Sequence, residues 1–145
     1  MAEMVQASHV LTIATRGNGV TEITGDLARW IESVAAEDGL LTVFVRHTSA
    51  SLTIQENADP NVRVDLLDAL EALAPEARDY AHREEGPDDM PSHIKSMLTS
   101  VSLGIPVRDG RMTLGTWQGV YLIEHRAQPH QRTVVLSFIG HAAAA

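Results

Sequence analysis

The order of strand-like and helix-like patterns along this chain constrains its fold more than any other feature. Side chains alternate between two faces over residues 9–15, as in a β-strand, and the Gly17-Asn18-Gly19 run suits a tight turn, so the chain is expected to open with a β-hairpin. The middle of the chain changes to helical spacing, and the last third returns to strand patterns. Because helices occur between groups of strands rather than in strict alternation with them, the order predicts an α+β or sandwich-like fold and not a doubly wound sheet.

Three helices are expected between the strands. The first begins near Thr24 and ends at Gly39, and the second begins at Asp59-Pro60, where Asp can cap free amides and Pro has no amide to lose, and ends at Pro75. A short third helix contains His93. Strands are expected at residues 9–15, 40–46, 51–55, 105–107, 111–114, 119–124 and 133–139.

Length and composition limit the function classes. A chain of 145 residues is the size of one domain, so we expect a single domain over residues 1–145, with 1–8 and 141–145 as frayed tails. A formal net charge of -8 opposes nucleic-acid binding, and no stretch reads as a signal peptide or membrane span, so we expect a cytoplasmic protein without nucleic-acid or membrane partners. Without cysteine, any metal ion is left to histidine, carboxylate or amide ligands.

The candidate chemistry lies with three of the seven histidines. His47 ends an apolar strand and opens a His-Thr-Ser run, a place where polar groups can face a cleft, although a hydrogen-bonded structural histidine fits equally well. His82 and His93 bracket an acidic segment that includes Asp89, which could bind a divalent cation or supply acid and base groups. The alternative is a solvated acidic loop in which Asp89 caps the following helix.

Two further candidate features lie between residues 115 and 132. Residues 115–119 place two glycines around a polar and aromatic tip, which suits close backbone approach to a ligand or a plain turn. Glu124 and Arg132, at the ends of neighbouring predicted strands, could form an ion pair or present charge to a site. Ser49 lacks the Gly-x-Ser-x-Gly context of a hydrolase nucleophile, and no phosphate-binding glycine motif is present.

Taken together, several segments resemble the YjbQ family, described as secondary thiamine-phosphate synthases. The matching stretches are HTSASLTIQENADP at residues 47–60, YAH at 80–82, EG at 85–86, HIK at 93–95 and GRMTLGTWQGVYLIE at 110–124. The resemblance implies a YjbQ-like two-sheet β-sandwich of the α+β class with two to three helices, assembled through its sheets as a homotrimer.

The resemblance also implies an activity and a set of site residues. A thiamine-phosphate synthase-like transferase would join a pyrimidine pyrophosphate to a thiazole phosphate with release of pyrophosphate, here as a secondary activity on small phosphorylated metabolites. The expected catalytic residues are His47, His82, His93, Asp89 and Glu124. The expected substrate-binding residues are Thr48, Ser49, Asn57, Lys95, Gly115, Thr116, Gln118 and Arg132.

The expected cofactor is a divalent metal ion, magnesium or a transition ion such as zinc, held by His47, His82 and His93, with no organic cofactor. Because three histidines favour a transition ion whereas pyrophosphate chemistry uses magnesium, two alternatives stay open. One is a histidine-metal hydrolase of a small phosphorylated or carboxylated metabolite, and the other is a trimeric metabolite-binding protein without turnover. The chain also has His130 where the family usually has an arginine, which removes one cation from a phosphate site.

Overall fold

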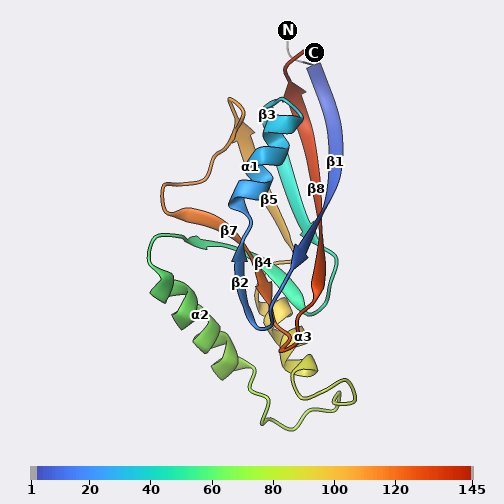
Figure 1. Ribbon diagram of the computed structural model, residues 1–145, viewed down its shortest axis with the longest axis vertical. Helices are drawn as coiled ribbons and strands as arrows, with labels where there is room; N and C mark the ends of the chain where they lie inside the picture. Colours follow the sequence, from blue (N-terminus) through green and yellow to red (C-terminus); the bar gives the residue numbers. More distant parts are fainter. Residues whose placement is uncertain (1–2, 145) are drawn as a thin grey trace.

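The structure, a computed structural model, describes residues 3–144 and confirms the α+β class (Figure 1). A five-stranded antiparallel sheet has the strand order β1-β8-β3-β5-β6, and a three-stranded antiparallel sheet has the order β2-β7-β4. The described part of the chain also contains three helices. None of these helices has the length and apolar character needed to cross a membrane.

The strands and helices follow one another in an order close to the predicted one. The strands are β1 (Glu3–Ala14), β2 (Gly19–Glu22), β3 (Ala36–Val45), β4 (Ala50–Glu56), β5 (Ser102–Arg108), β6 (Arg111–Met112), β7 (Gln118–Glu124) and β8 (Gln131–Ala142). The helices are α1 (Thr24–Ser33), α2 (Pro60–Leu73) and α3 (Asp89–Leu98).

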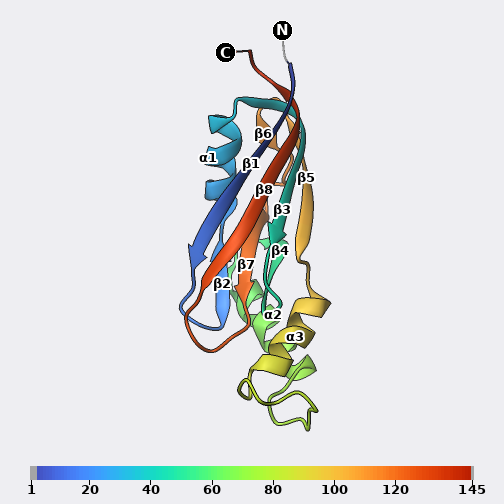
Figure 2. The same cartoon turned by 90° about the vertical axis from the view of Figure 1, so that its right-hand side faces the viewer.

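The core lies between the two sheets and α1. Along β8, Val134, Leu136 and Phe138 alternate with partly or fully exposed side chains, so one face of the five-stranded sheet is buried. Helix α1 contributes Leu27 and Ile31 to the same core. The opposite face of this sheet is turned toward the viewer in Figure 2, and no helix or strand within residues 3–144 covers it.

Helix α2 lies against the other face of the small sheet, where its leucines line a small cavity together with side chains of β2, β4 and β7. It begins as predicted, because the Asp59 side chain accepts a hydrogen bond from the Asn61 amide and Pro60 occupies the first turn. None of its residues is fully buried, and Leu73 is 62% exposed, so the predicted apolar face is only partly covered.

Three local expectations are wrong. The first two strands do not form a hairpin, because β1 pairs with β8 and β2 pairs with β7, and the turn at Gly17 carries the chain from one sheet to the other. Helix α1 ends at Ser33 and not at Gly39, since Ala35 takes a positive φ of 54° and β3 begins directly after it. Residues 3–8 and 141–142, expected to belong to frayed tails, are paired ends of β1 and β8; residues 1–2 and 145 lie outside the described residues.

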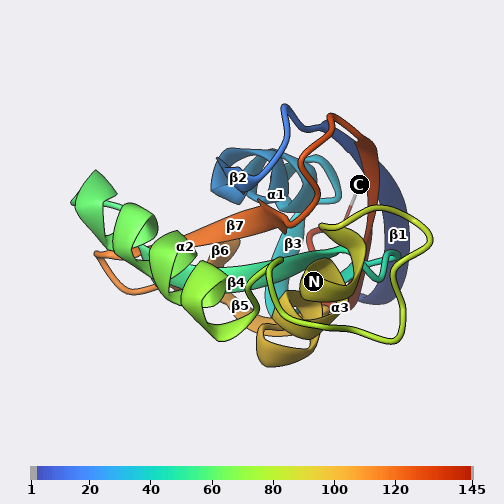
Figure 3. The ribbon, with the colours of Figure 1, turned by 90° about the horizontal axis from the view of Figure 1, so that it is seen from below.

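Helix α3 and the loop before it cover one end of the molecule, as seen from below in Figure 3. At this end β3 stops, β4 starts, β7 stops and β8 starts, because Val45 pairs with Val134 and Ala50 pairs with Glu124. The chain therefore brings the ends of four strands and one helix to one place.

Candidate functional site

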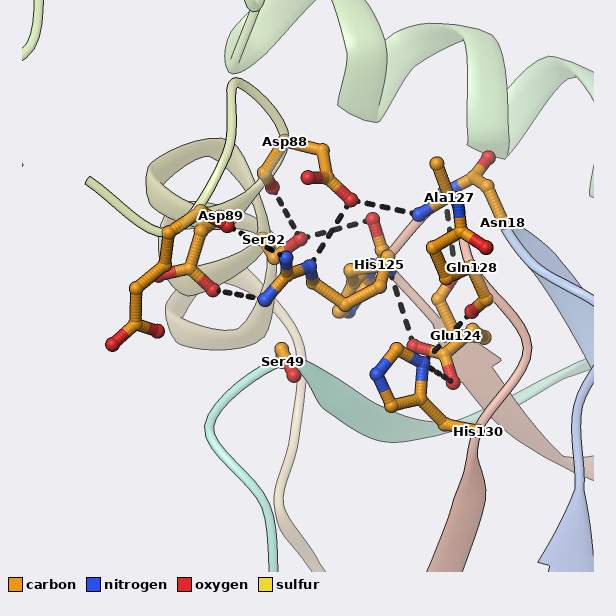
Figure 4. Close-up of polar contacts among 12 residues, drawn as sticks. Asn18, Ser49, Asp88, Asp89, Ser92, Glu124, His125, Ala127, Gln128 and His130 are labelled. Carbon is orange, nitrogen blue, oxygen red and sulfur yellow. Dashed lines mark hydrogen bonds and ion pairs between the residues drawn. The ribbon is translucent and has the colours of Figure 1, made fainter. Parts of the chain in front are cut away.

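The strand ends and α3 bring together most of the polar residues that the sequence singled out. Figure 4 shows Asp88 and Asp89 at the start of α3, close to His125 and Ala127 in the segment that follows β7, with Glu124 and His130 beside them. Ser92 connects the two sides, because its hydroxyl oxygen lies 2.6 and 2.9 Å from the carbonyl oxygens of Asp88 and His125 and shares its one proton between them. The helix is thus fixed against the strand by hydrogen bonds.

Two histidines converge on one carboxylate oxygen at the solvent side of α3. The Nε2 atoms of His82 and His93 lie 2.7 and 3.1 Å from Oδ2 of Asp89. One ligand atom from each of the three residues falls within 4.8 Å of the others. Asp89 is 4% exposed while the histidine side chains are 45% and 34% exposed, so the buried carboxylate forms the floor and the imidazoles form the open rim.

Arg126 fixes the orientation of this carboxylate. Its guanidinium donates from Nη1 to Oδ1 of Asp89 at 2.6 Å and from Nε to Oδ2 of Asp88 at 3.0 Å. Burial opposes ionisation of Asp89, but the hydrogen bond from His82 and the charges of His93 and Arg126 outweigh it and hold its pKa below the ordinary value. Asp89 is therefore an anion with one oxygen occupied by Arg126 and the other facing the histidines.

The ring of His93 is oriented by the backbone. Its Nδ1 lies 3.1 Å from the carbonyl oxygen of Thr48, which can only accept, so Nδ1 carries the proton. The Nε2 atom then meets Asp89 either as the second N–H of an imidazolium or as a lone pair directed at a cation. A backbone carbonyl on the distal nitrogen is the usual support of a metal-binding histidine.

Glu124 and Arg132 form the buried ion pair that the sequence suggested. Arg132 donates from Nε to Oε1 of Glu124 at 2.7 Å and from Nη2 to Oε2, and both side chains are almost completely buried. Burial opposes ionisation of Glu124, but hydrogen bonds from Arg132, Thr15 and the Arg126 amide lower its pKa below the ordinary value. Arg132 also donates to the hydroxyl of Ser49 at 3.0 Å, which fixes the chain after His47.

His47 lies apart from the His82, Asp89 and His93 group. Its Nε2 accepts a hydrogen bond from the Thr133 amide at 2.8 Å, and its Nδ1 lies 3.3 Å from Nη1 of Arg132. Burial, and then the positive charge of Arg132, lower the pKa of His47, so the ring is neutral. A metal-binding role for His47 stays a prediction. The third residue grouped with His82 and His93 is Asp89 and not His47.

The remaining predicted residues either have another partner or lie at the far end of the three-stranded sheet. Lys95 is buried and pairs with Glu71 of α2. The polar side chains Asn57 and Gln118 lie at the opposite end of the β4–β7 pair from Ala50 and Glu124, at a distance of about 20 Å by strand rise. Gly115 and Thr116 precede Gln118 at that far end, where the Gln118 side chain accepts from the Gly115 amide.

Sequence reasoning missed His125, the most deeply buried histidine of the site. Its Nε2 lies 2.8 Å from the Ser51 hydroxyl, its Nδ1 has no protein partner among residues 3–144, and it is 3% exposed. Burial, aided by the charge of Lys95, lowers its pKa to about 4, so the ring is neutral. Four apolar or aromatic residues in β7, at positions 120–123, precede Glu124 and His125, so the sequence around His125 resembles an ordinary buried strand. The position of His125 directly after Glu124 was the only signal.

Two contiguous grooves open beside the site. One, of about 370 Å³, is lined by His93, Ser96, Met97 and Thr99 together with His47, Thr48 and Val101. The other, of about 580 Å³, shares the last three residues and adds Phe44, Val45, Arg46 and Ser49. The His93 imidazole, at the rim of the Asp89 group, therefore faces a continuous open surface that leads to Arg46.

Comparisons with known proteins support one family. Residues 9–141 match the family model described as UPF0047 protein YjbQ-like. A UPF0047 protein of Synechocystis sp. is 50% identical over 136 residues, which cover 93% of this chain and 92% of the relative, and UPF0047 protein YjbQ of Salmonella typhimurium is 43% identical over 131 residues, covering 90% and 95%.

Solved structures agree with the fold. A YbjQ-like protein of unknown function from Sulfolobus solfataricus superposes with a TM-score of 0.88 at 20% identity, over 95% of this chain and 99% of that one. An uncharacterized YjbQ/UPF0047 protein from Clostridium acetobutylicum gives a TM-score of 0.79 at 34% identity, over 92% and 99%.

The expected thiamine-phosphate synthase activity is wrong by these comparisons. The relatives are described only as UPF0047 proteins, and one solved structure is described as having unknown function, so nothing in them supports thiamine biosynthesis or a transferase, a hydrolase or a binding protein without turnover. The geometry agrees within one chain: Asn57 and Gln118 lie at the opposite end of the β4–β7 pair from Glu124, and Lys95 is engaged with Glu71. The residues expected to bind the two phosphorylated substrates therefore do not lie close together within one chain.

Proposed function

The chain belongs to the family of YjbQ-like UPF0047 proteins, and from its own residues we propose that it binds one divalent transition-metal ion through His82, Asp89 and His93. The observation that supports this proposal is the convergence of two imidazole nitrogens on a single carboxylate oxygen. Two histidines and one carboxylate form a common ligand set for first-row transition ions.

The positions of the ligands in the sequence suit a preorganised site. Asp89 and His93 are four positions apart on α3 and therefore project from the same face of the helix. Arg126 holds one oxygen of Asp89, and the Thr48 carbonyl holds the distal nitrogen of His93. Such second contacts fix the ligands before the ion arrives and strengthen binding.

The ligand types favour a transition ion over magnesium. Imidazole nitrogen suits zinc, iron and related ions, whereas magnesium prefers oxygen ligands and retains several waters. Three protein ligands leave coordination positions for an exogenous group, as in metal sites that act on a ligand rather than only stabilise a fold. When bound, the ion would polarise a ligand oxygen at the rim of the grooves.

Zinc titration of chelator-treated protein by calorimetry tests the proposal. The wild type is expected to bind one equivalent, and the His82→Ala/His93→Ala double variant is expected to lose about a hundredfold or more in affinity. His141→Ala is the matched control, because His141 is exposed on β8. Equal zinc binding by the double variant and the wild type would overturn the proposal.

We also propose that copies of the chain associate as a homotrimer through the uncovered face of the five-stranded sheet. That face exposes Met4, Val10, Leu40, Phe44 and Ile139. The side chains between them, such as Ser8, Thr42 and Ser137, are uncharged, so a second copy would meet no like-charge repulsion there.

A further inference from the structure

The hydrogen bonds around His47 leave two N–H donors, one on His47 and one on Arg132, without an acceptor. The Thr133 amide donates to Nε2 at 2.8 Å, so Nε2 carries the lone pair and the neutral ring carries its proton on Nδ1. That Nδ1–H faces Nη1 of Arg132 at 3.3 Å, and a guanidinium nitrogen can only donate. Each of these two nitrogens therefore faces another donor, and neither has an acceptor among residues 3–144.

The other donors of Arg132 are already used. Its Nε and Nη2 bond to the Glu124 carboxylate, and Nη2 also bonds to Ser49. Among residues 3–144, the hydrogen bonds of Nη1 include only the contact with His47. Arg132 is 4% exposed, so an unpaired donor on its guanidinium is costly unless an external acceptor reaches it.

The larger groove beside His47 has the charge to hold such an acceptor. Arg46 lines it with an exposed side chain, and its other lining side chains, which include Thr48 and Ser49, contain no carboxylate. In a chain of net charge -8, a groove lined by an arginine and hydroxyls but no acidic side chain is locally favourable for an anion.

We propose that His47, Arg132 and Arg46 form an oxyanion-binding site that takes the phosphate or carboxylate group of a small ligand. The Nδ1–H of His47 and Nη1–H of Arg132 bind one oxygen, and Arg46 attracts the anion from the rim. Because the two grooves share His47, Thr48 and Val101, an anion placed here lies next to His93. This inference rests on the proposed function in one respect only, which is that the metal ion and the oxyanion bind at the same site.

The remaining groove wall indicates the other part of the ligand. Met97 is 80% exposed, and Val101, which lines both grooves, is also exposed, so apolar surface borders the polar groups in both grooves. A small molecule with an oxyanion at one end and an apolar body fits this arrangement better than an inorganic ion alone.

The test uses chelator-treated protein, so that no metal ion contributes. Inorganic phosphate is titrated against protein carrying ¹⁵N-labelled histidine, with acetate in a parallel series to distinguish a phosphate from a carboxylate preference. We expect a saturable change in the imidazole signals of His47. Arg46→Gln is expected to weaken the affinity about tenfold, while Arg108→Gln, an exposed arginine on β5, leaves it unchanged.

A second variant removes the ring donor itself. His47→Phe replaces the imidazole with an aromatic ring that has no nitrogen, and it should abolish phosphate binding measured by calorimetry. If this variant fails to fold, the His47 signals of the wild type and the comparison of the two arginine variants still decide the question. No change at His47 with either anion, or equal affinity of Arg46→Gln and Arg108→Gln, would overturn the inference.

The outcomes separate this inference from the proposed function. Zinc binding without a phosphate effect on His47 leaves the metal site standing and removes the oxyanion site. Phosphate binding at His47 by a protein that takes up no zinc does the reverse.

Discussion

At the scale of single residues, the site depends on which polar atoms are already satisfied. Asp89 gives one oxygen to Arg126 and keeps the other for the histidines, whereas Glu124 gives both oxygens to internal partners. The two buried carboxylates therefore have different roles. Asp89 is available to an external cation, and Glu124 supports the fold and the position of Arg132.

Glu124→Gln is expected to destabilise the protein by about 3–5 kcal/mol, because the buried Arg132 would lose its counter-charge. Denaturant unfolding at neutral pH measures this change. Glu32→Gln on α1 is the matched control and should stay within about 0.5 kcal/mol of the wild type, since that carboxylate is exposed. A small effect of Glu124→Gln would contradict a structural role for the pair.

The stability of the wild type should fall at acid pH for the same reason. The pKa of Glu124 is lowered on folding, so its ionised form contributes stability above the unfolded value near 4.5, and this contribution is lost as pH falls through the lower folded value. Unfolding midpoints measured from neutral pH to pH 3 should therefore decrease below about pH 4.5, and less steeply in Glu124→Gln. Parallel curves for the two proteins would contradict this account.

At the scale of elements, local signals predicted helix starts better than strand partners. The Asp59-Pro60 start of α2 depends on neighbours within a few residues, and the structure confirms it. The pairing of β1 with β8 joins residues more than a hundred positions apart, and no turn residue encodes it. The hairpin prediction was wrong because the Gly17–Gly19 turn fits a sheet change as well as a hairpin.

The β3–β8 pairing depends on two facing glycines. A Cβ at Gly140 would lie 2.3 Å from the Asp38 carbonyl oxygen and 2.5 Å from the Cα of Gly39. Gly140→Ala should therefore cost about 1–3 kcal/mol, as measured by thermal or denaturant unfolding. Gly104→Ala on β5 is the control, because its nearest neighbour would be Leu40 Cδ1 at an ordinary 3.7 Å, and a larger loss there than at Gly140 would contradict the register.

At the scale of the whole molecule, the fold gathers groups that are distant in the sequence. His82, Asp89 and His93 lie close in the chain, and the sequence predicted them as a group. The contribution of Arg126, and the separation of His47 from this group, follow from how β7 ends and β8 begins beside α3 and could not be inferred from spacing. Asn57 and Gln118 were grouped with the site by resemblance alone, and the antiparallel β4–β7 register places them at the far end.

The uncovered sheet face leads to a prediction about assembly. Ile139→Lys places a charge on that face and should shift the protein toward the monomer in light scattering coupled to size exclusion. Leu73→Lys on α2 changes an equally exposed apolar side chain elsewhere and should leave the assembly intact. A wild-type monomer, or dissociation by Leu73→Lys alone, would contradict association through the five-stranded sheet.

The central claim is that His82, Asp89 and His93 hold one transition-metal ion, and anomalous diffraction from crystals soaked in a zinc salt tests it most directly. The account predicts one strong anomalous peak within bonding distance, about 2.0–2.2 Å, of His82 Nε2, Asp89 Oδ2 and His93 Nε2. Crystals of Asp89→Asn provide the comparison and should show a weaker peak. Zinc bound elsewhere with no peak between these three atoms would contradict the account.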